Sequence, residues 1–145
     1  MQIQDGLTLK GELEVAVMRD GLVVDWFRDS NLIVEGARDM LAQLIAGDGN
    51  GNAVTEIGFG TNGDAASPDD TSLTGSYWRP LSGHTYPALG KVRFEFALST
   101  TEANGVAIRE FGLRTSDGSL FSRKARGTIE KNDDISLEGT WTITL

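Results

Sequence analysis

The chain of 145 residues lacks cysteine and contains a single histidine, His84. Without cysteine it has no disulfide, no thiolate nucleophile and no cysteine-ligated zinc. His84 and Ser82 are two residues apart in an extended segment, where their side chains point to the same side without meeting. No acid is placed by the sequence to orient the ring. We therefore predict no catalytic residues, no cofactor and no metal, and a protein that is not an enzyme.

Long apolar runs are also missing. No stretch approaches the roughly 20 apolar residues that cross a bilayer, and the start, MQIQDGLTLKGE, lacks the basic and then apolar regions of a secretory leader. The net charge of −8 opposes non-specific nucleic-acid binding, which depends on neutralising phosphates. We expect neither a membrane nor a nucleic acid as partner. The absence of disulfides fits folding in a reducing cytoplasm.

Acidic charge is concentrated in one half of the chain. Residues 1–75 carry a net charge of −9, whereas residues 76–145 carry +1. Two interpretations stay open. A polar distribution can orient subunits head to tail, or the charge is simply solvated surface.

What the chain does have is alternating patterns and tight turns, which predict β-hairpins. Residues 106–126 contain two apolar-rich segments around Asp117-Gly118, a pair that suits a turn with positive φ. Residues 11–28 form a second hairpin around Asp20-Gly21, in which we expect Trp26 to be a large anchor. Clean alternation also predicts strands at 91–99 and 135–145, and a shorter strand at 54–60.

One segment has helical instead of strand periodicity. In residues 31–46 the apolar side chains recur at helical spacing, and Gly47 is placed as the C-terminal cap. These side chains are Ala37, Met40, Leu41, Leu44 and Ile45. We predict a mainly β fold: an antiparallel β-sandwich of about seven or eight strands with one covering α-helix, in a single domain over 1–145.

The hairpin at 106–126 is the one basic region of this acidic chain. It carries Arg109, Arg114, Arg123, Lys124 and Arg126. We hypothesise that Arg109, Arg114, Arg123 and Arg126 contribute to an interface with another subunit or a partner. Tyr77 and Trp78 follow a polar loop, and we expect these two aromatic residues to contribute to the interface as well.

Two motifs suggest ligands but lack the required context. Residues 58–63 match G-x-G-x-x-G, yet DAASPDD follows, which is acidic and broken by proline, so a glycine-rich turn fits better than a nucleotide site. Residues 48–52, DGNGN, resemble the opening of a calcium loop. Ala53 and Phe59 occupy the positions that an EF-hand needs as Gly and Glu. A weak calcium site with Asp64, Asp69 or Asp70 stays as the alternative to a polar loop.

The order of several short segments resembles a known family. The segments are NLIV at 31–34 followed by a helix, IGFGT at 57–61 followed by an acidic, Thr-rich loop, IREFGL at 108–113, SLFSR at 119–123 and GTWTI at 139–143. This order, over roughly residues 30–145, resembles small tail or baseplate structural proteins of tailed bacteriophages and prophages, and the N-terminal modules of some of their tail fibres. On this basis residues 1–30 are an N-terminal β-hairpin extension and 31–145 are the family-like core.

The resemblance implies a non-enzymatic virion structural protein of the tail, baseplate or fibre-attachment region. Such a protein is assembled in the bacterial host cytoplasm and forms homo-oligomers with itself and complexes with other virion proteins. No functional residue transfers, because the shared segments are core and turns. Two alternatives stay open: a carbohydrate- or receptor-binding module of a tail fibre that uses Tyr77, Trp78 and Tyr86, and a phage head decoration protein.

Overall fold

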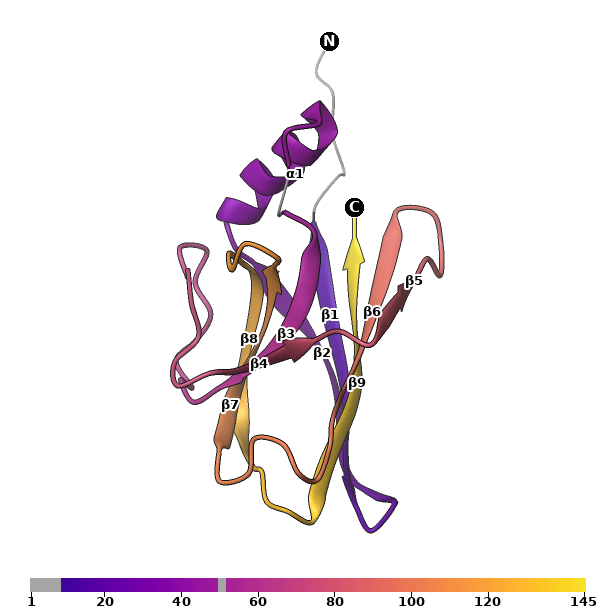
Figure 1. The fold of residues 1–145 in the computed structure, drawn as a ribbon, viewed down its shortest axis with the longest axis vertical. Helices are drawn as coiled ribbons and strands as arrows, with labels where there is room; N and C mark the ends of the chain where they lie inside the picture. The colour runs from indigo at the N-terminus through magenta and orange to yellow at the C-terminus, as the bar shows by residue number, and fades with distance from the viewer. Residues whose placement is uncertain (1–8, 50–51) are drawn as a thin grey trace.

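A computed structural model describes residues 9–49 and 52–145, which form one antiparallel sheet of nine strands and one helix (Figure 1). The elements are β1 (Lys10–Arg19), β2 (Leu22–Ile33), α1 (Gly36–Ala46), β3 (Val54–Gly60), β4 (Tyr77–Pro80), β5 (Gly83–Thr85), β6 (Lys91–Leu98), β7 (Ala107–Thr115), β8 (Leu120–Glu130) and β9 (Ile135–Thr144). The order across the sheet is β4-β3-β7-β8-β2-β1-β9-β6-β5. The mainly β, antiparallel prediction is confirmed.

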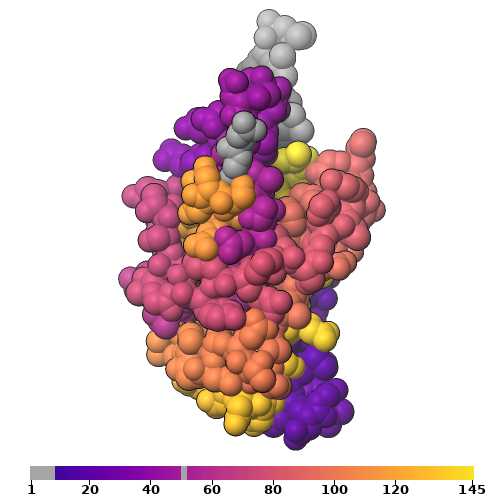
Figure 2. Space-filling view, viewed as in Figure 1, coloured from indigo at the N-terminus to yellow at the C-terminus, as the bar shows by residue number. Residues whose placement is uncertain are grey.

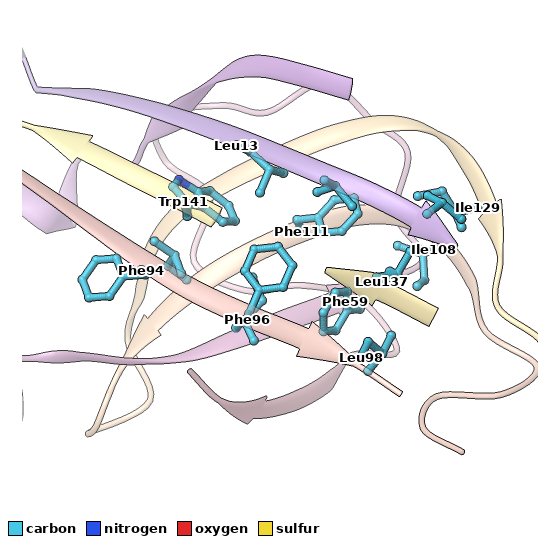
Figure 3. Close-up of a cluster of buried hydrophobic side chains, with 14 of the residues drawn as sticks. Leu13, Phe59, Phe94, Phe96, Leu98, Ile108, Phe111, Ile129, Leu137 and Trp141 are labelled. Carbon is cyan, nitrogen blue, oxygen red and sulfur yellow. The ribbon is translucent and has the colours of Figure 1, made fainter. Parts of the chain in front are cut away.

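The sheet curls into a half-barrel, so that strands near its two ends face each other. β3 and β6 are the second and the eighth strand across the sheet. The ring centroids of Phe59 in β3 and Phe96 in β6 nevertheless lie 6.1 Å apart (Figure 3). Long β2 makes this possible: it pairs with β1 over Leu22–Asn31 and reaches β8 only at Leu32 and Ile33. Two separate sheets, as in the predicted sandwich of seven or eight strands, are not confirmed, because β2 joins both halves.

The core lies on the concave face. Buried positions alternate along β1, β6 and β9, whereas β3, β7 and β8 contain runs of buried residues. The largest side chains of the core are fully enclosed. They include Leu13, Phe59, Phe111, Leu113, Leu137 and Trp141, each 0% exposed. The alternation predicted for the strands at 91–99 and 135–145 is confirmed, except that Leu145 is exposed.

Both predicted hairpins form around their predicted turns. Asp20 and Gly21 have φ values of +53° and +77°, the pair of positive angles that matches the twist of the flanking strands. The strands of this first hairpin lie in the middle of the sheet, between β8 and β9. The segment described from the resemblance as an N-terminal extension is therefore integral to the sheet wherever the structure describes it.

Two local predictions need correction. The helix spans Gly36–Ala46 and not 31–46, because residues 31–33 belong to β2. Gly47 caps its C-terminus with φ +83°, as predicted. It covers little of the core: Ala37 is buried, but Leu44 and Ile45 are exposed, so part of the predicted apolar face points to solvent. Trp26 is no buried anchor. It alternates with Phe27, whose ring packs against the core, so the side chain of Trp26 lies on the outer face of the sheet, where 54% of it is exposed.

Gly139 in the middle of β9 allows a test of the packing. A Cβ at this position would lie 2.6 Å from the backbone oxygen of Glu14 and 2.4 Å from the ring of Phe96. We expect Gly139→Ala to lower the free energy of unfolding by about 1–3 kcal/mol, because strand backbone must shift. In urea unfolding the matched control Gly127→Ala, which has no atom within 4 Å, should be neutral or slightly stabilising. Equal effects of the two substitutions would contradict this packing.

Candidate interaction surface

Glycines on the outer face of the sheet make room for a long loop. A Cβ on Gly58 would lie 2.6 Å from the ring of Trp78, and a Cβ on Gly60 would lie 2.8 Å from the backbone oxygen of Thr74. Side chains are therefore missing where β4 and the 61–76 segment lie against β3. The G-x-G-x-x-G pattern has a packing reason in the structure, and no helix follows it.

Glu110 of β7 holds both ends of this loop. One carboxylate oxygen, Oε2, accepts hydrogen bonds from the backbone N–H groups of Asn62 and Thr74, each at 2.9 Å. The side chain is 0% exposed, because the loop lies over it. Figure 2 shows the segment between β3 and β4, coloured magenta to pink, spread across the front of the molecule.

Arg123 of β8 completes the loop anchor. Its Nε donates to Oε1 of Glu110 at 2.8 Å, and its Nη1 donates to Asp70 at 3.0 Å. Its Nη2 donates to the backbone oxygens of Asn62 and Asp64, each at 2.9 Å. Burial lowers the pKa of the guanidinium, but the bonds to Glu110 and Asp70 outweigh it and raise that pKa. Arg123 therefore stays charged and binds strand to loop.

This placement corrects the interface prediction for Arg123. The residue is 1% exposed and all its bonds are internal to the chain, so a partner cannot reach it without displacing the loop. Its long side chain crosses the outer face of β8 towards β7, instead of extending into solvent. Arg123 is part of the fold.

The other three arginines of the predicted interface are partly exposed, and each has a contact within the chain. Arg114 pairs with Glu56 at 2.9 Å and lies 4.2 Å from the ring centroid of Trp78. Arg126 lies 3.9 Å from the ring centroid of Phe27. It also forms an ion pair with Asp25 at 3.6 Å, which is longer than the pair of Arg114 with Glu56.

Among the described residues, Arg109 donates to neutral acceptors, the hydroxyl of Thr128 at 3.1 Å and the backbone oxygen of Thr61 at 3.4 Å. The ion pairs of Arg114, Arg123 and Arg126 with acidic residues offset part of the positive charge of the hairpin.

The two predicted contact aromatics are half-buried. Trp78 packs against a small second cluster on the outer face, formed by Val34, Leu73 and Leu120. The hydroxyl of Tyr77 donates to Glu102 at 2.8 Å. Both side chains therefore help to hold β4 on the sheet, and each is only partly exposed.

The calcium hypothesis finds no support among the described side chains. No group of three or more His, Cys, Asp or Glu residues in the described ranges could hold a metal ion. Asp70 is already bonded to Arg123 and to the backbone N–H of Ser67. Asn52 is buried and donates to the Met40 oxygen and the Gln43 side chain of α1. Asn50 of the DGNGN motif lies outside the described residues.

Sequence reasoning named Tyr86 as a candidate contact residue but missed the other exposed apolar side chains of the described residues, which lie in three places. β2 exposes Leu22, Val23, Val24 and Trp26 at 51–70%. The region of the β5–β6 connection and the C-terminal end exposes Tyr86, Leu89 and Leu145, and α1 exposes Leu44 and Ile45. For β2 the sequence does contain a signal, because four of the five residues in Leu22–Trp26 are apolar. The sequence does not show that these side chains are left uncovered in the folded sheet.

Comparison with family models, with curated proteins and with solved structures finds no match to the chain. The described residues include no helix long and apolar enough to cross a bilayer. The candidate surface therefore has to be judged on its own geometry.

Removing Arg123 tests the loop anchor. We expect Arg123→Met to lower the free energy of unfolding by about 3–5 kcal/mol, because Glu110 is left as a buried, unpaired charge. The control Arg109→Met removes a partly exposed arginine that has no ion pair with any residue that the structure describes, and should cost about 1 kcal/mol or less. Urea unfolding monitored by tryptophan fluorescence compares the two. A loss in Arg123→Met no larger than in the control would show that the buried pair does not hold the loop.

The contacts of Glu102 with Tyr77 and Arg79 of β4 should be sensitive to acid. Burial raises its pKa, but hydrogen bonds from Ser99 and Tyr77 and the nearby Arg79 outweigh burial and lower it. A lowered folded-state pKa stabilises the protein above the unfolded pKa, and this contribution is lost as the pH falls through the folded value. In unfolding experiments from neutral to acid pH, Glu102→Gln should therefore be less stable than the wild type at neutral pH. The difference should shrink at acid pH; a constant difference would contradict the role of ionised Glu102.

Proposed function

We propose that this protein is a non-enzymatic structural subunit of a tailed-bacteriophage virion, in the tail, baseplate or fibre-attachment region. The observation that carries the proposal is the distribution of side chains. Glu110 and Arg123 are paired inside the fold, while nine large hydrophobic side chains of residues 9–49 and 52–145 are exposed. Contiguous exposed apolar residues mark surfaces that other proteins cover.

The number of exposed groups supports assembly with more than one neighbour. The apolar residues of β2, of α1 and of the region around Tyr86 and Leu89 belong to different parts of the fold. A subunit that contacts both copies of itself and other proteins needs more than one such surface. The loop over the sheet, tied by Glu110 and Arg123, gives these contacts a defined scaffold.

A carbohydrate- or receptor-binding module of a tail fibre is the alternative proposal. Among its three candidate aromatics, Tyr86 is 75% exposed and stands edge-on to His84, with ring centroids 5.6 Å apart. An open ring of this kind is what a sugar needs for stacking, whereas Tyr77 and Trp78 are half-buried. A head decoration protein would use the same exposed apolar surfaces on a capsid.

Particles of a phage whose genome encodes the chain test the proposal directly. We expect the chain in purified virions at a fixed copy number after separation from free protein, measured by quantitative mass spectrometry. Tail preparations freed of heads should retain it, whereas recovery with heads alone would favour the decoration protein. Its absence from purified particles would overturn the proposal.

A further inference from the structure

We propose that Lys131 and Asn104 form an intramolecular amide cross-link, in which Nζ of the lysine is bonded to Cγ of the asparagine. The bond joins the β8–β9 connection to the β6–β7 connection and forms with release of ammonia. This modification of the chain goes beyond the proposed function and does not depend on it. The inference starts from the burial of Lys131, which is 0% exposed.

The buried amine of Lys131 has neutral partners. Its Nζ donates to Oδ1 of Asn104 at 2.7 Å and to the backbone oxygen of Asn132 at 3.0 Å. The other fully buried cation, Arg123, is paired with two carboxylates, whereas none of the ion pairs among the described residues includes Lys131. A buried ammonium without a counter-ion is costly, so the neutral amine is favoured here.

Burial also makes this amine a better nucleophile. It lowers the pKa of Lys131, and the opposing negative charges of Glu102, Asp133 and Asp134 do not outweigh it. The neutral form of a lysine is the one that attacks a carbonyl carbon, because it has a free electron pair. At a given pH, Lys131 is therefore in the reactive form more often than an exposed lysine.

The carboxamide of Asn104 is held next to the amine. Its Oδ1 accepts from Nζ, and its Nδ2 donates to the backbone oxygen of Thr100 at 2.9 Å. Since a C=O bond is about 1.2 Å long, Nζ lies no further than about 3.9 Å from Cγ, close to the separation of atoms that are about to react. Rotation about the terminal torsion of Asn104, which is soft, turns the face of Cγ towards Nζ.

The two connections are also fixed in register by their backbones. The N–H of Gly105 donates to the oxygen of Lys131 at 2.8 Å, and the N–H of Lys131 donates to the oxygen of Val106 at 3.0 Å. Asn104 lies in a tight turn between Ala103 and Gly105, which have φ values of +53° and +88°. Both connections lie at the end of the sheet opposite α1 (Figure 1). The reacting groups are therefore brought together by the fold itself.

The reaction balances without an oxidant or a cofactor. The neutral Nζ attacks Cγ of Asn104, the bond between Cγ and Nδ2 breaks, and one proton passes from Nζ to Nδ2, which leaves as ammonia. Asn104 is exposed, so solvent water can carry the proton and ammonia can escape. The new amide has no charge, and its remaining N–H can still donate to the backbone oxygen of Asn132.

The cross-link would brace a chain that has no other covalent brace. Without cysteine the chain cannot form a disulfide. A bond between residues 104 and 131 closes a loop through β7 and β8 and so restricts the unfolded chain in the way a disulfide does. It would tie the arginine-bearing hairpin to the rest of the half-barrel at its open ends.

The intact mass of the denatured full chain tests the bond. We expect the wild type to be about 17 Da, one ammonia, lighter than the same chain without the cross-link. Lys131→Arg keeps a cation but not a nucleophilic amine, and Asn104→Ala removes the carboxamide, so neither should lose this mass. The matched control Asn132→Ala should lose it, because this residue contributes its backbone oxygen. Circular dichroism melting shows which variants are folded.

Peptide mapping by tandem mass spectrometry separates the cross-link from another reaction with the same mass change. The wild type should yield a branched peptide in which residue 131 is joined to residue 104. Cyclisation of Asn104 with the backbone nitrogen of Gly105 also releases ammonia, but it gives a linear peptide and would persist in Lys131→Arg. That result, or a wild type of unchanged mass, would overturn the proposal, whether or not the chain is found in virions.

Discussion

The buried pair of Glu110 and Arg123 is the interaction on which the outer half of the molecule depends. Taking two charges out of water is costly, and their attraction offsets this only when the remaining donors and acceptors are also bonded. Here Glu110 receives two backbone N–H groups and Arg123 reaches Asp70 and two carbonyl oxygens. Hydrogen bonds to the backbone of the 61–76 loop thus replace the hydrogen bonds to water that the two charged groups lose, and they hold this polar loop against the sheet.

That loop in turn explains the glycines beneath it. Gly58 and Gly60 leave a floor without side chains, on which Trp78 and the backbone near Thr74 can lie close to β3. A second small apolar cluster forms there, outside the main core, and Arg114 covers the indole of Trp78. Charge, glycine and tryptophan therefore act together: each would be unfavourable on an exposed strand, and each is accounted for once the loop is in place.

What could be predicted from the sequence depends on how far apart in the chain the interacting residues lie. Both hairpins were predictable, because Asp20-Gly21 and Asp117-Gly118 specify turns through local backbone conformation. The burial of Arg123 was not, because its partner Asp70 is 53 residues away in sequence and within a polar loop. Trp26 shows the converse: alternation tells which residues of a strand share a face, but it does not tell which face packs on the core, and in β2 that face carries Phe27 and not Trp26.

The divergence of β2 from β8 links the fold to the surface that it offers. Arg126 bridges the two strands near the start of the opening, through Asp25 and the ring of Phe27. Beyond that point β2 continues towards its turn, and the side chains of Leu22, Val23, Val24 and Trp26 are exposed. Exposed apolar area of this kind is unfavourable in water, and contact with a partner would remove it from water. The divergence of the two strands is therefore a feature of the fold that leaves apolar side chains uncovered, and these side chains are among those on which the proposed role in assembly rests.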